Sequence, residues 1–107
     1  MRFELHSGPI KVPATLHKAI GRKVDKVEQR LKRYHPDVAE MELRVAHVEK
    51  LNEYECNLVL RAFKETMHAS KSAPELRVAV DKSFEAMMLQ LDHYRVKLNK
   101  SLQDHSE

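Results

Sequence analysis

The chain has 107 residues, of which 42% are hydrophobic and 33% are charged, and its formal net charge is +3. This length and composition are typical of one soluble globular domain. They exclude a membrane-spanning helix, because no apolar run approaches ~20 residues. They also exclude an internal disulfide, because Cys56 is the only cysteine. The N-terminal residues lack the apolar segment of a secretory signal, so we expect a cytoplasmic protein.

The chain begins with a predicted strand and a long predicted helix. Residues 2–6 alternate apolar and polar side chains, as in a half-buried strand. Residues 13–34 repeat apolar side chains every three or four positions, which predicts an amphipathic helix. The apolar stripe of this helix consists of Leu16, Ile20, Val24, Val27, Leu31 and Tyr34. His35-Pro36 should end the helix, because the residue before a proline is disfavoured in helical conformation. Gly21, in its middle, indicates either close packing or a bend.

Three more strands and a second helix are predicted to follow. Residues 38–48 and 54–63 alternate in character and are joined by a polar segment of hairpin length. Residues 66–70 form a shorter fourth strand. The sequence SAPE at 72–75 has the pattern of a capping box and should open a helix from 74 to about 100. The apolar stripe of this second helix consists of Leu76, Val80, Phe84, Met87, Leu91, Tyr94 and Leu98.

The predicted order β-α-β-β-β-α indicates an α+β fold with a four-stranded mixed sheet. A helix joins the first two strands, so they should be parallel, and hairpins join the others. Each helix has one wide apolar stripe, so both helices should pack on one face of the sheet. We expect a single domain over residues 1–100 and a short polar tail, 101–107, that frays.

Nothing in the sequence indicates catalysis. It has no Gly-rich phosphate loop, no nucleophile motif and no Cys/His spacing of a metal site, so we expect no enzyme, no cofactor and no small-molecule substrate. The seven histidines are best interpreted as surface residues. His47 and His68, on strands of the predicted hairpins, leave a metal site open as an alternative. Cys56 has the core-facing register of its strand and is interpreted as a small buried hydrophobic residue.

The positive charge is concentrated in the first helix, which carries seven Lys and Arg residues against two acidic ones. Lys18, Arg22, Lys26 and Arg30 recur every fourth residue and form a strip opposite the apolar stripe, with steps of about 6 Å. Such a strip can follow a phosphodiester backbone, although a solvated charged face is the alternative. Residues 37–66 carry seven acidic against four basic residues, so the molecule should dock in one orientation. Without exposed aromatic pairs on adjacent strands, recognition of folded RNA by shape and backbone is favoured.

Residues 67–81, MHASKSAPELRVAVD, resemble a segment of the short-form ribosome hibernation factors, the sigma-54 modulation protein family. His68-Ala69-Ser70 matches the L-H-A-S-like strand end of the family, and residues 78–81 match its A-A-I-D-like helix segment. The sequence PATL at 13–16, followed by Lys23 and Lys26, resembles the family pattern T-P-A-L…K-x-x-K. The resemblance extends over about residues 1–97 and includes the order of the elements.

This resemblance implies a ribosome-associated translation inhibitor shaped like a double-stranded-RNA-binding domain. Such proteins occupy the channel of the small subunit where messenger and transfer RNA bind, and they preserve idle ribosomes under stress or in stationary phase. The implied partners are the small ribosomal subunit and its rRNA, with no membrane, and a second protein factor in ribosome dimerisation is left open. Lys23 and Lys26 are RNA-binding residues by the matched pattern. Helix geometry and charge add Lys18, Arg22, Arg30, Arg33, Arg95, Lys97 and Lys100.

The second helix departs from the family pattern. Where the family keeps lysines and an arginine in a D-K-L-D-R-Q-L-like run, this chain has EAMMLQL at 85–91. Met88 and Leu89 widen the apolar stripe, either as extra core or as a surface for a protein partner. The alternative function is therefore a protein-interaction module of the same fold that does not bind ribosomes. Dimerisation of ribosomes through a C-terminal domain is not expected of this chain.

Overall fold

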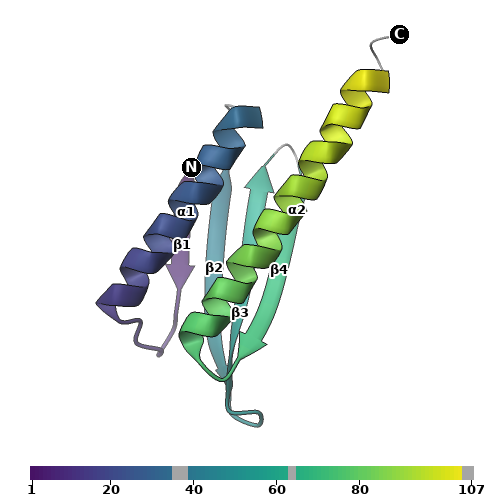
Figure 1. Cartoon of the computed structure of the whole chain (residues 1–107). Coiled ribbons are helices and arrows are strands. Elements are labelled where there is room, and N and C mark those ends of the chain that lie inside the picture. Colours follow the sequence, from purple (N-terminus) through teal and green to yellow (C-terminus); the bar gives the residue numbers. More distant parts are fainter. Residues whose placement is uncertain (35–38, 63–64, 105–107) are drawn as a thin grey trace.

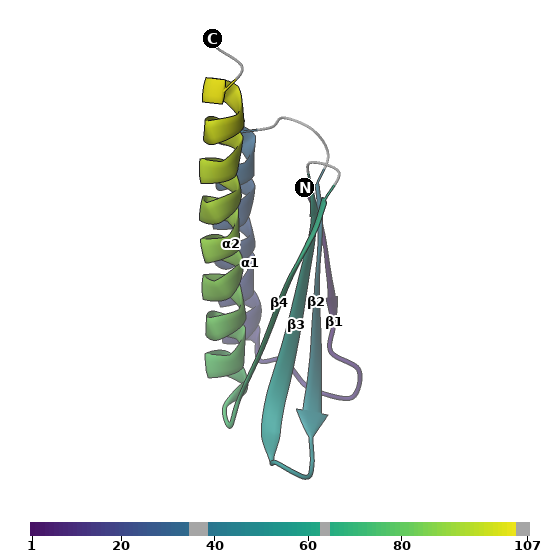
Figure 2. The ribbon, with the colours of Figure 1, turned by 90° about the vertical axis from the view of Figure 1, so that its right-hand side faces the viewer.

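The computed structural model describes residues 1–34, 39–62 and 65–104, without the side chains of 33–34 and from 95 onward. Its elements are β1 (Arg2–His6), α1 (Ala14–Tyr34), β2 (Glu40–Val48), β3 (Glu53–Ala62), β4 (Glu65–Ala73) and α2 (Leu76–Asp104). The strands form one sheet in the order β1-β2-β3-β4, seen in Figure 1. Figure 2 shows both helices on the same face of this sheet. The predicted α+β architecture is thus confirmed.

The pairing of the strands follows from the connections between them. β1 runs parallel to β2, with Leu5 opposite Leu43, because α1 carries the chain back across the sheet. β2 with β3 and β3 with β4 are antiparallel. At the tip of the β2–β3 hairpin, the Asn52 amide donates to the Glu49 carbonyl at 3.1 Å. Asn52 has φ 51°, a left-handed conformation that asparagine tolerates better than most residues.

The core lies between the sheet and the two helices. The apolar stripes of both helices face this core. Apolar residues at alternate positions of the strands form its other side. The buried residues include Leu16, Ile20, Val24, Val27 and Leu31 from α1, Val80, Phe84, Met87 and Leu91 from α2, and Met41, Leu43, Val45, Cys56, Leu58, Leu60, Met67 and Ala69 from the sheet. The side chains of Tyr34 and Leu98, predicted for the same stripes, lie outside the described residues. No helix in the described ranges is long and apolar enough to cross a membrane.

The junction between β4 and α2 differs from the prediction. β4 continues to Ala73, because Ser72 pairs with Glu55 and Ala73 with Tyr54. The capping box predicted at 72–75 is therefore wrong, since Ser72 belongs to a strand. α2 begins at Leu76 instead of 74, and the Ala79 amide donates to the Glu75 carbonyl at 3.1 Å.

Three predicted element boundaries lie outside the described residues, whereas the surroundings of Gly21 are described. The helix stop at 35–36, the strand start at 38 and the strand end at 63 lie outside the described ranges. Gly21 is exposed, and a Cβ built on it would have no heavy atom within 4 Å. Close packing is therefore not the reason for a glycine in the middle of α1.

Candidate nucleic-acid interface

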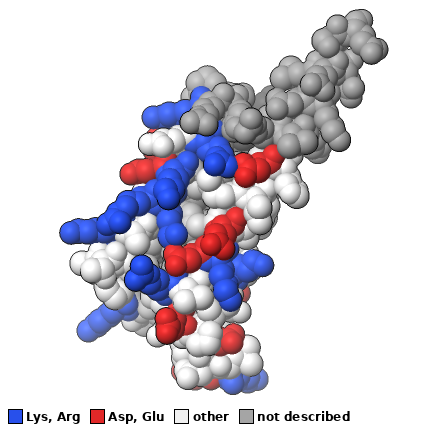
Figure 3. Space-filling view, viewed as in Figure 1, with Lys and Arg blue, Asp and Glu red and all other residues white. Residues whose placement is uncertain are grey.

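The cationic residues of α1 lie on two sides of the helix. The apolar stripe fixes the rotation of α1 on the sheet and thereby the direction in which each cation points. Lys18, Arg22 and Lys26 are exposed. Lys23 and Arg30 instead reach toward α2. Figure 3 shows Lys and Arg side chains gathered along α1, with acidic side chains beside them. We call Lys18, Arg22 and Lys26 the outer strip.

Two ion pairs connect α1 to α2. Lys23 Nζ lies 2.9 Å from Asp81 Oδ1, and Arg30 Nη1 donates to Asp92 Oδ1. The four side chains are between 29% and 44% exposed. Half-exposed pairs of this kind contribute only about 0.2–1 kcal/mol each to stability. Their larger effect is local, because each carboxylate neutralises one of the cations that the sequence predicted for RNA.

A groove of about 610 Å³ lies between the two helices. Its lining residues are Lys23, Lys26 and Arg30 from α1, and Phe84, Glu85, Met88, Leu89 and Asp92 from α2. The α1 wall is cationic, whereas the α2 wall carries carboxylates beside apolar side chains. Met88 packs against the core, but Leu89 is 61% exposed. The interpretation of both residues as extra core therefore holds for Met88 and is wrong for Leu89.

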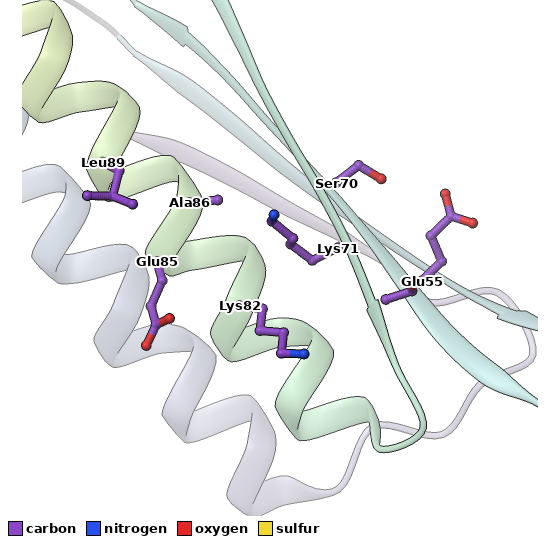
Figure 4. Close-up of a pocket in the computed structure, with 8 residues that line it drawn as sticks. Glu55, Ser70, Lys71, Lys82, Glu85, Ala86 and Leu89 are labelled. Atoms are coloured by element: carbon purple, nitrogen blue, oxygen red, sulfur yellow. The ribbon is translucent and has the colours of Figure 1, made fainter.

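A second groove, of about 650 Å³, lies between α2 and β4. Figure 4 shows Lys71 pointing from β4 toward α2, with Lys82 on the helix nearby. Glu55 and Glu85 also line this groove, so its charge is mixed. It does not continue the outer strip, which makes α1 the better candidate for contact with a polyanion.

Asp81 and Asp92 were not predicted as partners of the α1 cations. Each directly follows a core residue of α2, Val80 or Leu91, and the two lie about three helical turns apart. Their position on one side of α2 was therefore visible in the sequence. That this side faces α1 follows only from the packing of the helices.

The other predicted RNA-binding residues belong to the C-terminal parts of α1 and α2. The side chains of Arg33, Arg95, Lys97 and Lys100 lie outside the described residues. Their part in the interface stays a prediction.

The metal site considered for His47 and His68 is wrong. β3 lies between the strands that carry them, and alternation places the two side chains on opposite faces of the sheet. The His47 ring instead packs edge-on against Tyr54, with 4.9 Å between the centroids. Among the described residues, no group of three or more His, Cys, Asp or Glu could hold a metal ion.

Cys56 is fully buried, as predicted. Burial away from water disfavours the thiolate and raises the pKa of Cys56 from 9.0 to about 11. The thiol is therefore neutral at physiological pH and belongs to the core rather than to a reactive site.

The solved structures with this fold include a Protein Y domain and a ribosomal subunit interface protein. The N-terminal domain of Protein Y from Thermus thermophilus aligns with a TM-score of 0.70 at 12% identity, covering 88% of this chain and 99% of that one. A ribosomal subunit interface protein from Coxiella burnetii aligns with a TM-score of 0.59 at 13% identity, covering 90% and 99%. No curated protein matches the sequence.

The sequence itself carries the evidence for the family. Residues 3–99 match the family described as Sigma 54 modulation protein / S30EA ribosomal protein. The match includes α1, β2, β3 and β4 in full and most of β1 and α2. The chain therefore belongs to the Sigma 54 modulation protein / S30EA ribosomal protein family.

Proposed function

We propose that this protein is a ribosome hibernation factor that binds the rRNA of the small subunit and inhibits translation under stress or in stationary phase. It acts in the cytoplasm by occupying the channel of messenger and transfer RNA, without catalysis. Family membership supports ribosome association. The observation that carries the proposal is the outer strip of α1, where Lys18, Arg22 and Lys26 are exposed on a helix held by the core.

The outer strip suits a phosphate backbone because its cations sit on a rigid element. Binding a phosphate releases condensed counterions, so each contact steepens the salt dependence of binding by about 0.7–0.9 in log K against log salt. A protein that binds in this way blocks a channel by its volume, and its affinity falls as salt rises.

The charges on the open face of the sheet indicate that RNA binds to the helix side of the molecule instead. On the open face of the sheet, Arg2 lies 2.9 Å from Glu4, and Arg44 lies 2.7 Å from Glu42. His6 Nε2 lies within 3.3 Å of both glutamates. Arg2 and Arg44 on this face are thus paired locally. Within the described part of the chain, no ion pair is formed by Lys18, Arg22 or Lys26 of the outer strip.

Co-sedimentation with purified small subunits across a salt series tests the proposal. The variant Lys18→Glu with Arg22→Glu should lose binding at salt concentrations where the wild type still sediments with the subunit. A matched control, Lys71→Glu with Lys82→Glu, reverses two charges in the groove beside β4 and should bind more tightly than the α1 variant. Equal sedimentation of the α1 variant and the wild type at every salt concentration would contradict the proposal.

A second candidate function is a protein-interaction module of the same fold. The exposed Leu89 beside the interhelical groove favours it, since the resemblance places an arginine of the family there. Affinity capture at moderate salt separates the two candidates. Recovery of one protein, without rRNA, that is lost with Leu89→Asp would support the module, whereas recovery of rRNA supports the hibernation factor.

A further inference from the structure

We propose that Asp81 and Asp92 of α2 determine which side of α1 contacts RNA. Asp81 forms an ion pair with Lys23, and Asp92 forms one with Arg30. The outer strip, Lys18, Arg22 and Lys26, is therefore the part of α1 that contacts the phosphates. The inference rests on the proposed binding of rRNA by α1 and specifies the surface that carries it.

The geometry places one carboxylate at each end of the groove. Lys23 and Arg30 are seven residues apart, or about 10 Å along the helix, and each is paired with an aspartate of α2. Glu85 lines the same groove between them. Figure 4 shows the side chain of Glu85 directed toward α1.

The carboxylates act on RNA in two ways. They compete with phosphates for Lys23 and Arg30, because a paired cation must break its ion pair before it can bind a new anion. They also repel any phosphate that enters the groove, since like charges at short range disfavour approach. Lys18 and Arg22 of the outer strip do not line the groove, and Lys26 lines it without an ion pair to a described side chain. A phosphate backbone on the outer strip therefore has no ion pair to break and stays farther from these carboxylates.

A merely structural role of the same residues makes a different prediction. If Asp81 and Asp92 only fasten α1 to α2, their loss lowers stability and weakens binding. If they direct the RNA, their neutralisation releases two cations and strengthens binding. The slope of affinity against salt separates these cases, because it counts phosphate contacts and does not depend on thermal stability.

The experiment measures binding of the full chain to purified small ribosomal subunits over a salt series. The variant Asp81→Asn with Asp92→Asn should bind about tenfold more tightly at low salt, with a slope of log K against log salt steeper by about 1.4–1.8. Glu85→Gln is the matched control. It removes a charge from the same groove, but Glu85 forms no salt bridge with the side chains that the structure describes. Its slope should therefore stay close to that of the wild type.

A second pair of variants tests the outer strip directly. Lys23→Met with Arg30→Met should weaken binding less than Lys18→Met with Arg22→Met, although both remove two charges from α1. The opposite order would overturn the inference, and so would an unchanged slope for Asp81→Asn with Asp92→Asn in a protein that binds. If neither the wild type nor the aspartate variant binds small subunits at low salt, the proposed function fails and the inference fails with it.

Discussion

Lys71 lies directly opposite Cys56 in the register of β3 and β4, yet Cys56 is fully buried and Lys71 is exposed. Both side chains are on the helix side of the sheet. They differ because β4 is an edge strand and the Lys71 side chain reaches the groove beside α2. A charged residue on the inner side of an edge strand hinders pairing with the edge of another molecule.

We therefore expect Lys71→Val to promote self-association. The substitution replaces the inward charge with a residue of high strand propensity and leaves the β4 edge without this protection. Sedimentation equilibrium over a concentration series should show stronger dimerisation than for the wild type. Lys82→Val removes a charge from the same groove on α2 and should associate no more than the wild type. Indistinguishable behaviour of the two variants would contradict the role given to Lys71.

The buried Cys56 thiol should resist alkylation in the folded protein. Its pKa of about 11 leaves almost no thiolate at pH 8, and the core excludes the reagent. Labelling at pH 8 should therefore be slow without denaturant and fast with it. Rapid labelling of the folded protein would show that the thiol is accessible.

The same thiol makes stability depend on alkaline pH. In the unfolded chain its pKa is near 9.0 and in the folded protein about 11, so the folded state holds the proton more tightly. The stabilisation is complete below about pH 9 and is lost as pH rises toward 11. Denaturant unfolding of the wild type over this range should show a decline in the free energy of unfolding. Cys56→Ala should show a smaller decline, and an equal decline would exclude the thiol as its cause.

Gly21→Ala should stabilise the protein by about 0.4–1 kcal/mol. The position is exposed and helical, and a Cβ there has no heavy atom within 4 Å, so alanine gains helix propensity without a clash. Thermal unfolding should give a higher Tm. Gly8→Ala is the informative comparison, because Gly8 has φ 53° and alanine there is strained by about 1–2 kcal/mol. A lower Tm for Gly21→Ala would indicate that α1 needs a flexible residue at this point.

Side-chain periodicity predicted the fold because burial here follows simple repeats. The spacing of Leu16, Ile20, Val24, Val27 and Leu31 sets the face of α1 that packs on the sheet, and all five are buried. The alternation of apolar and polar residues did not predict the end of β4. Lys71 and Ser72 are both polar, because solvent reaches this edge strand from the side.

The candidate interface was predictable only in part. The outer strip is a property of one helix, so its residues could be read from their spacing. The pairing of Lys23 with Asp81 and of Arg30 with Asp92 joins residues 58 and 62 positions apart. Such contacts depend on how two helices lie side by side on the sheet, which a repeat within either helix does not encode.

The burial of Cys56 allows a fluorophore to be attached to the protein at a chosen position. Ser70 is exposed on β4, and Figure 4 shows its side chain pointing away from α2. A cysteine introduced at this position would be the only accessible thiol at neutral pH, with the native cysteine left in place. A fluorophore attached there would report the arrival and departure of the protein at its target from the side that makes no proposed contact.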